Sequence, residues 1–154
     1  MEKIKKAMKK RKVKVKSDSA TCLLTPIGVI RSSLKLRQEA PRQGYEGAPE
    51  AWVEVASAFA PGLQGIEVGQ DIILLTWFHV AKRDVLKGHP RWDKNLPITG
   101  VFSTRSPDRP NPIGLHRVRV LETSASKLRV VPLEAIDGTP VIDIKPVLDE
   151  AKDS

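Results

Sequence analysis

The segment from residue 100 to 117, GVFSTRSPDRPNPIGLHR, most narrows the structures this chain can adopt. Pro107, Pro110 and Pro112 fix φ and remove backbone donors, and each pushes the preceding residue toward extended conformations. The segment is therefore predicted to be a stiff, extended loop rather than a helix. Apolar runs flank the segment on both sides. Loops held by such a scaffold often carry binding residues.

Short apolar runs bounded by Gly, Pro, Asp or Ser recur along the rest of the chain, which is typical of strands. The body of the chain shows no convincing helical periodicity over ten residues, and a single helical turn is expected near residues 62–66. The predicted strands are residues 23–30, 51–56, 71–79, 99–103, 115–121, 127–133 and 141–144. Strands without alternating helices favour an all-β fold, a single-domain antiparallel β-barrel with few short helices.

The net charge of +8 lies in the N-terminal residues. Residues 1–16 carry nine basic side chains and one acidic side chain, and the rest of the chain carries 17 of each. We predict a flexible basic arm over residues 1–20 and one domain over residues 21–150. Within that domain, residues 82–129 carry eleven basic and four acidic side chains, which favours a polyanionic partner such as RNA.

Several function classes find no support in the sequence. A single cysteine, Cys22, excludes an internal disulfide and favours a reducing, cytoplasmic location. No apolar run is long enough to span a bilayer, and the basic N-terminus lacks the apolar segment of a secretory signal. Neither a dinucleotide-binding glycine fingerprint nor a P-loop is present. The histidines lie far apart, so no metal site is expected.

Four segments place polar residues beside apolar strands. In the proline-rich loop, fixed guanidinium and amide groups suit a charged, planar ligand, although a rigid surface connector is the alternative. Arg42 is the only base in an acidic stretch, and a solvated side chain is the alternative there. His79 ends the most apolar strand, where histidines are more often satisfied core or rim residues than catalysts. Asp143 is predicted to share a strand face with Val141 and Lys145, and a simple surface ion pair between Asp143 and Lys145 is the alternative to a functional role.

Together these segments resemble the TrmO family of S-adenosylmethionine-dependent tRNA methyltransferases, also called TsaA-like or YaeB-like. The matching stretches occur in the family's order over roughly residues 23–148. They read IGVIRS at 27–32, PRQ at 41–43, WFH at 77–79, GVFSTRS at 100–106, RPNPIG at 109–114 and DGTPVIDIKP at 137–146.

The resemblance implies a β-barrel unrelated to Rossmann methyltransferases, and a homodimer with the cofactor site near the subunit interface. It implies methylation, by S-adenosyl-L-methionine, of the base nitrogen of N6-threonylcarbamoyladenosine next to the anticodon of a tRNA. The residues matching its donor-binding positions are Pro41, Arg42, Gln43, His79, Val80, Arg105, Arg117, Glu134, Ala135, Ile136 and Asp137. Candidate substrate-binding residues are Arg109, Asn111 and Lys145, and candidate catalytic residues are His79 and Asp143.

The chain ends at Ser154, before the C-terminal extension of larger family members, so a different tRNA or acceptor stays open. A carboxylate, His79 or the substrate's own carboxylate could accept the proton that the nitrogen loses. Two other functions also fit the sequence: a non-catalytic RNA-binding barrel, and a methyltransferase acting on a small molecule.

Overall fold

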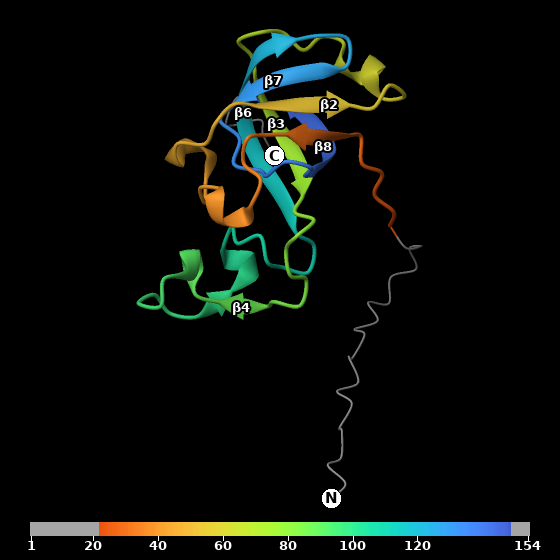
Figure 1. Cartoon of the computed structure of the whole chain (residues 1–154). Coiled ribbons are helices and arrows are strands. Elements are labelled where there is room, and N and C mark those ends of the chain that lie inside the picture. The colour runs from red at the N-terminus through yellow and green to blue at the C-terminus, as the bar shows by residue number, and fades with distance from the viewer. Residues whose placement is uncertain (1–21, 149–154) are drawn as a thin grey trace, which may run out of the picture.

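A computed structural model describes residues 22–148 of the chain. Six antiparallel strands close into a barrel in the order β1-β2-β7-β6-β3-β8 (Figure 1). They are β1 (Gly28–Arg31), β2 (Ala51–Val55), β3 (Asp71–Trp77), β6 (Ile113–Thr123), β7 (Lys127–Val131) and β8 (Pro140–Pro146). The predicted all-β barrel is confirmed. The predicted arm, residues 1–20, lies outside the described residues.

The barrel interior is filled by residues that alternate along each strand. On β6, Val118 and Val120 are at most 1% exposed, whereas Arg117 and Arg119 face outward. Ile72 and Leu74 of β3 pack against them from the neighbouring strand. The predicted division of this strand into an apolar and a basic face is therefore confirmed, and the hydrophobic effect fixes the strand register.

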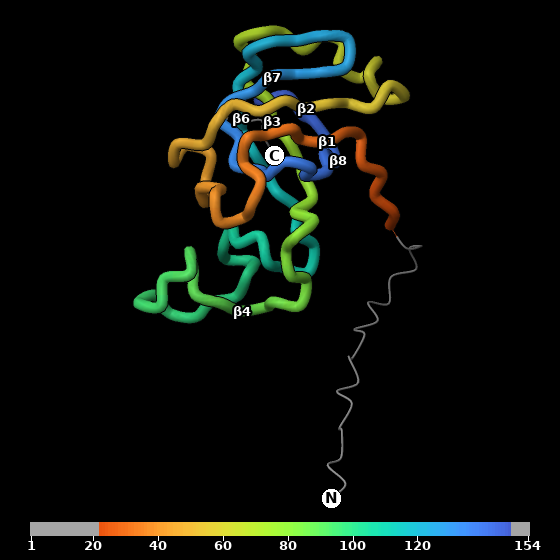
Figure 2. The backbone as a smooth tube through the Cα atoms, in the orientation of Figure 1, coloured from red at the N-terminus to blue at the C-terminus, as the bar shows by residue number. Residues whose placement is uncertain are grey.

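Between β3 and β6 the chain leaves the barrel and forms a lobe over residues 78–112 (Figure 2). In it β4 (Lys87–Gly88) pairs with β5 (Thr99–Gly100), apart from the barrel sheet. The strand predicted over residues 99–103 is wrong beyond Gly100, because Val101–Ser103 form a 3-10 helix, η5. The three prolines begin only at residue 107, so they leave this turn free to form.

The other helices are single 3-10 turns: η1 (Arg37–Glu39), η2 (Gly44–Glu46), η3 (Ala60–Leu63) and η4 (Pro90–Trp92). The turn expected near residues 62–66 therefore occurs slightly earlier. Among residues 22–148, no helix has the length and apolar character needed to cross a membrane. The strands predicted over residues 23–30 and 127–133 are too long, since Pro26 and Pro132 lack the N–H groups that a longer ladder needs. The strands predicted over residues 51–56 and 71–79 also end slightly earlier, at Val55 and Trp77.

An irregularity in β8 changes which side chains share a face. Val141 pairs with Thr76, but Asp143 pairs with Leu75, so the register shifts between these pairs. Asp143 lies on the outer face with Lys145, and its carboxylate is 2.9 Å from the Lys145 ammonium. The prediction that Asp143 shares a face with Val141 is wrong, because a bulge inserts an extra residue between them.

Candidate functional site

A cleft of about 1710 Å³ opens where one end of the barrel meets the lobe. Its lining comes mainly from residues 37–45, 78–82, 89–92, 103–109, 113–119 and 131–136. Pockets for small molecules usually enclose about 300–1,000 Å³, so this cleft has room for more than one ligand.

A buried polar trio lies at the base of the cleft. His116, on the interior face of β6, is 3% exposed, and Thr76 on β3 is fully buried. The His116 Nε2 atom is 2.7 Å from the Thr76 hydroxyl, and its Nδ1 atom is 2.6 Å from Glu134 Oε1. Because a carboxylate only accepts hydrogen bonds, His116 Nδ1 donates to Glu134. Both ring nitrogens are thus satisfied, and the ring orientation is fixed.

The backbone of β6 passes very close to this trio at Gly114. A Cβ atom there would lie 2.5 Å from the Thr76 hydroxyl and from Phe78 Cζ, and 2.7 Å from His116 Nε2. Phe78 also packs edge-on against the imidazole, with ring centroids 5.8 Å apart. Only glycine leaves room for this packing, which gives the glycine of the RPNPIG motif a structural reason.

Thr76 and His116 belong to the site but were not predicted as parts of it from the sequence. A signal was present, because both are polar residues at core-facing positions of neighbouring strands. Thr76 follows Ile72 and Leu74 at two-residue spacing, and His116 precedes Val118 in the same way. Polar groups on the interior face of a barrel need hydrogen-bond partners. Here Thr76 and His116 are hydrogen-bonded to each other.

An ion pair joins two walls of the cleft. The Arg37 guanidinium donates two hydrogen bonds to Asp108, of 3.0 and 2.9 Å. The backbone N–H of Lys82 donates a third, of 2.9 Å. Burial opposes ionisation of Asp108, but these hydrogen bonds outweigh it and lower the pKa of its carboxyl. One carboxylate therefore connects η1, the start of the lobe and the proline-rich loop.

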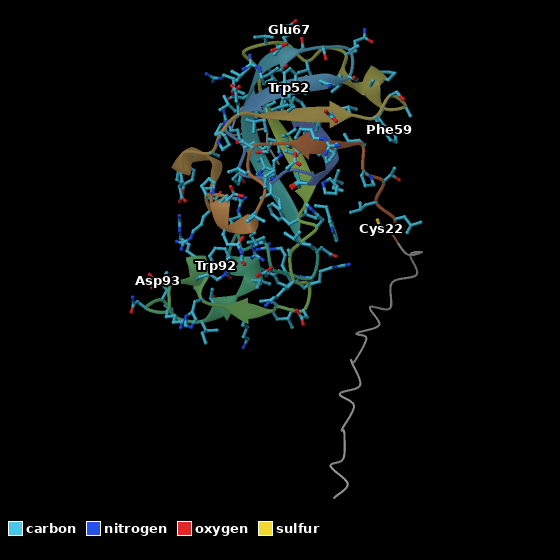
Figure 3. The ribbon with its side chains drawn as sticks, in the orientation of Figure 1. Cys22, Trp52, Phe59, Glu67, Trp92 and Asp93 are labelled. Atoms are coloured by element: carbon cyan, nitrogen blue, oxygen red, sulfur yellow. The ribbon has the colours of Figure 1, made fainter. Side chains whose placement is uncertain are left out.

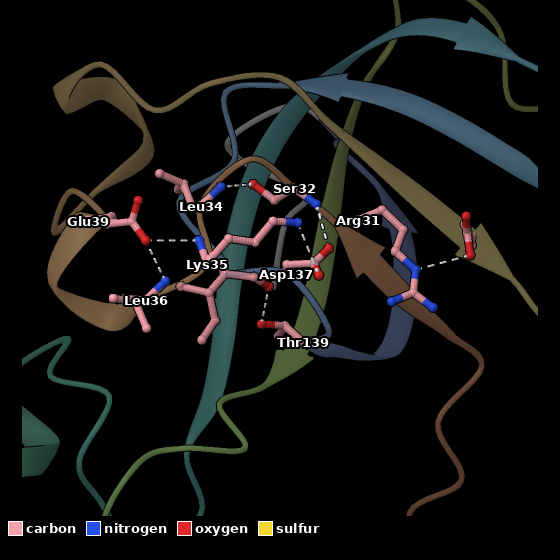
Figure 4. A network of polar contacts seen from close by, with 10 residues as sticks. Arg31, Ser32, Leu34, Lys35, Leu36, Glu39, Asp137 and Thr139 are labelled. Atoms are coloured by element: carbon pink, nitrogen blue, oxygen red, sulfur yellow. Dashed lines mark hydrogen bonds and ion pairs between the residues drawn. The ribbon is translucent and has the colours of Figure 1, made fainter.

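A second network holds the connection between β7 and β8 against the segment after β1 (Figure 4). The Ser32 N–H donates to Asp137 over 3.0 Å, and the Lys35 ammonium is 3.3 Å from the same carboxylate. The Ser32 hydrogen bond, with Lys35, lowers the pKa of Asp137. Glu39 accepts from the N–H groups of Lys35 and Leu36. Asp137 thus positions the chain that leads into the cleft walls.

The outer face of β6 forms the edge of the cleft. There Arg119 and Arg117 donate to Asp71 over 2.9 and 3.1 Å, and the Arg119 hydrogen bond is the main reason that the pKa of Asp71 is lowered. Ile113 and Leu115 on the same face are 43% and 49% exposed. This edge therefore combines exposed apolar side chains with paired arginines.

The structure brings most of the predicted donor-binding residues to one cleft. Those that line it are Pro41, Arg42, Gln43, His79, Val80, Arg105, Arg117, Glu134, Ala135 and Ile136. Asp137 does not line it and acts through the network above. Arg117 lies at the outer edge, bound to Asp71. Their roles in binding stay predictions.

The predicted substrate-binding and catalytic residues are less concentrated. Arg109 lines the cleft, but its guanidinium binds loop carbonyls, including that of Ser106 at 2.8 Å. Asn111 accepts from Arg83 over 3.2 Å and does not line the cleft. Asp143 and Lys145 pair with each other outside it. Of the two catalytic candidates, only His79 lines the cleft.

Each acidic side chain of the cleft is paired with a basic side chain. Several basic side chains of the cleft, in contrast, have no acidic partner in the part of the chain that the structure describes. Asp71, Asp108 and Glu134 are each held by a basic side chain. Within residues 22–148, no ion pair engages Arg42, Arg105 or Lys82. The cleft can therefore bind an anion through these cations and a polar or cationic group through Glu134.

Known proteins with similar sequences match most of this chain. Residues 29–153 match the family model of the tRNA-methyltransferase O N-terminal domain. An Archaeoglobus fulgidus protein named S-adenosyl-L-methionine-binding protein is 45% identical over 123 residues, which are 80% of this chain and 87% of that protein. A Methanothermobacter thermautotrophicus protein named "Probable S-adenosyl-L-methionine-binding protein" is 42% identical over 127 residues, covering 82% and 90% of the two chains.

Solved structures agree with these matches. A crystal structure of TrmO from Pseudomonas aeruginosa superposes with a TM-score of 0.70 at 32% sequence identity. The match covers 88% of this chain and 60% of that one. Another structure of TrmO gives a TM-score of 0.69 at 34% identity and covers 62% of its chain. This chain thus spans about three-fifths of the length of the solved structures.

Proposed function

The chain belongs to the family of the tRNA-methyltransferase O N-terminal domain, and from this we propose that it is an S-adenosyl-L-methionine-dependent tRNA methyltransferase. The acceptor we propose is the base nitrogen of N6-threonylcarbamoyladenosine beside the anticodon. One observation carries the proposal: residues 41–43, 79–80, 105 and 134–136, far apart in sequence, converge on one cleft.

The cleft has the chemistry that the methyl donor requires. Phe78 and Ile136 line the cleft and offer apolar surface for its adenine, and residues 41–43 and 134–135 line it too. Glu134, oriented by His116, supplies an anionic partner for a positively charged ligand. When bound, the donor supplies an electrophilic methyl group, so the protein's contribution is mainly alignment of the accepting nitrogen.

The unpaired cations suit the acceptor. Arg42, Arg105 and Lys82 line the cleft and are available to bind the threonyl carboxylate or tRNA phosphates. His79 is available to accept the proton from the carbamoylated nitrogen, because it lines the cleft. Asp143 is poorly placed for that step, since it is paired with Lys145 outside the cleft.

We also propose that the protein acts as a homodimer. Ile113 and Leu115 expose apolar surface on the outer face of β6, at the edge of the cleft. Exposed apolar groups rimmed by arginines are typical of protein interfaces. A second copy packed there would bring Arg117 of each subunit near a shared boundary of the two clefts.

The decisive experiment compares two tRNA substrates. Purified protein with a labelled methyl donor should methylate tRNA carrying threonylcarbamoyladenosine and should leave the same tRNA transcribed without it unmodified. Nucleoside mass spectrometry then locates the new methyl group. Equal incorporation into both tRNAs would refute the proposed acceptor. Incorporation into neither, together with binding of the donor, would favour a small-molecule acceptor.

A further inference from the structure

Trp92 stands at the rim of the cleft and has no place in the function described so far. It ends η4 in the lobe, lines the cleft and is 56% exposed (Figure 3). Leaving an indole in water forgoes much of the free energy that its burial would give. Its position at a charged cleft therefore calls for an explanation in terms of a ligand.

Two guanidinium groups approach the indole ring. The Arg37 and Arg42 ζ-carbons lie 5.4 and 5.6 Å from the ring centroid, within the range of cation–π attraction. Asp108 fixes Arg37 through two hydrogen bonds. Arg42 has no ion pair within the described part of the chain, so its charge is available to a ligand lying against Trp92.

The backbone beneath the indole adopts an uncommon conformation. Arg91 and Trp92 have φ of 53° and 54°, in the left-handed region that non-glycine residues seldom occupy. Two consecutive residues of this kind cost free energy, and such strain collects at binding sites. The Arg91 guanidinium pairs with Glu46, which ties this turn to η2 across the cleft. The indole is thus held at the rim by the backbone and by a cross-cleft ion pair.

A half-exposed aromatic ring beside an arginine that has no ion pair in the described part of the chain is an arrangement that suits single-stranded nucleic acid. Unpaired bases stack on aromatic side chains, and neighbouring phosphates pair with arginine or lysine. A surface ion pair alone would not require the indole, and an apolar protein partner would not require the cations.

We propose that Trp92 stacks on an unpaired base of the RNA substrate, next to the nucleotide that enters the cleft, while Arg42 contacts the adjoining phosphate. This inference rests on the proposed tRNA methyltransferase function. It adds a base-stacking residue on η4, which lies outside the segments matched to donor binding, and it uses Arg42 at the border between the two.

The test uses the fluorescence of Trp92 in the full chain. Trp52 and Trp77 are the other two tryptophans, so the double variant W52F/W77F leaves Trp92 as the only indole. It is titrated with a single-stranded RNA of anticodon-loop sequence, with an abasic oligomer of equal length and charge, and with S-adenosylhomocysteine. We expect strong quenching by the RNA and little quenching by the other two.

Each other outcome contradicts the stacking subsite. Equal quenching by the RNA and by the abasic oligomer would show that Trp92 responds to the phosphate charges and not to stacking of a base. Quenching by S-adenosylhomocysteine would assign the indole to the donor's adenine. RNA binding, seen by anisotropy of a labelled strand, without quenching would refute the inference but leave the proposed function standing. Absence of binding to the RNA oligomer would also refute the stacking subsite, whereas the proposed function is tested separately by methyl transfer to whole tRNA.

Affinity measurements on variants give a second readout. Trp92→Ala should weaken RNA binding about tenfold, and Trp92→Phe should keep most of the affinity, because stacking tolerates a smaller ring. Phe102→Ala is the matched control, since Phe102 is 83% exposed in the same lobe but does not line the cleft. It should bind RNA like the parent. An unchanged affinity of Trp92→Ala with native melting temperature would overturn the proposal.

Discussion

His116 donates a 2.6 Å hydrogen bond from Nδ1 to Glu134, and this contact joins the barrel interior to the cleft. The imidazole belongs to the core, whereas the carboxylate belongs to the wall that faces a ligand. Folding therefore sets the direction of the anionic group in the cleft, in the manner of an outer residue that orients a binding residue.

The first prediction concerns Glu134. Glu134→Gln keeps the shape of the side chain but removes the negative charge, so affinity for the positively charged S-adenosyl-L-methionine should fall about tenfold or more by calorimetry. The matched control is Glu122→Gln, which removes an exposed carboxylate paired with Arg129. It should bind the ligand like the parent. Equal losses in both variants would show a general charge effect instead.

The second prediction concerns His116. His116→Ala leaves Thr76 and Glu134 without their buried partner, and each unsatisfied group costs about 1–3 kcal/mol. The free energy of unfolding, measured with urea, should drop accordingly. Thr76→Val tests the other hydrogen bond of the same ring and should cost less. A stability equal to that of the parent in both variants would contradict a structural role for the trio.

The third prediction concerns the close packing at Gly114. Gly114→Ala places a Cβ atom 2.5 Å from Thr76 and Phe78, so it should destabilise the fold by about 1–3 kcal/mol. Gly62→Ala is the control, because a Cβ atom there meets nothing within 4 Å. Its melting temperature should stay near that of the parent. If the two variants melt at the same temperature, the close packing around Gly114 is ruled out as a source of destabilisation.

The fourth prediction concerns the Arg37–Asp108 ion pair. Folding lowers the pKa of Asp108, so its stabilisation is present above the unfolded pKa and is lost as pH falls through the folded one. Asp108→Asn should cost about 1–3 kcal/mol at pH 7, and the difference should shrink toward pH 3. Asp84→Asn, at an exposed position, is the control. A difference independent of pH would exclude this electrostatic origin.

The barrel could be predicted from sequence because its evidence is local. Alternation along residues 115–121 and the absence of helical runs follow from side-chain burial on two faces. The bulge in β8 could not be predicted, since the spacing of Val141, Asp143 and Lys145 looks regular and only pairing with β3 reveals the extra residue. The turn at Val101–Ser103 was missed for a similar reason, because tertiary contacts decide so short an element.

The parts of the candidate site that lie in sequence motifs could be predicted, whereas the parts that depend on tertiary packing could not. Residues 41–43 and 134–136 come from the family resemblance, and they do meet in one cleft. His116 and Trp92 were not predicted as site residues, because their roles depend on neighbours from distant segments. His116 contacts Glu134, and Trp92 contacts Arg37 and Arg42. Sequence spacing alone cannot show such encounters.

The last prediction concerns Arg105, which lines the cleft, is exposed and has no ion pair within residues 22–148. Arg105→Ala should therefore change the free energy of unfolding by less than about 0.5 kcal/mol, as expected for a surface position. Methyl transfer to tRNA should nevertheless be lost. Arg105→Lys keeps the charge but not the planar fork of donors, so partial recovery would indicate a charge contact and no recovery would indicate bidentate binding. Full activity of Arg105→Ala, or a large loss of stability, would show that Arg105 does not serve a ligand.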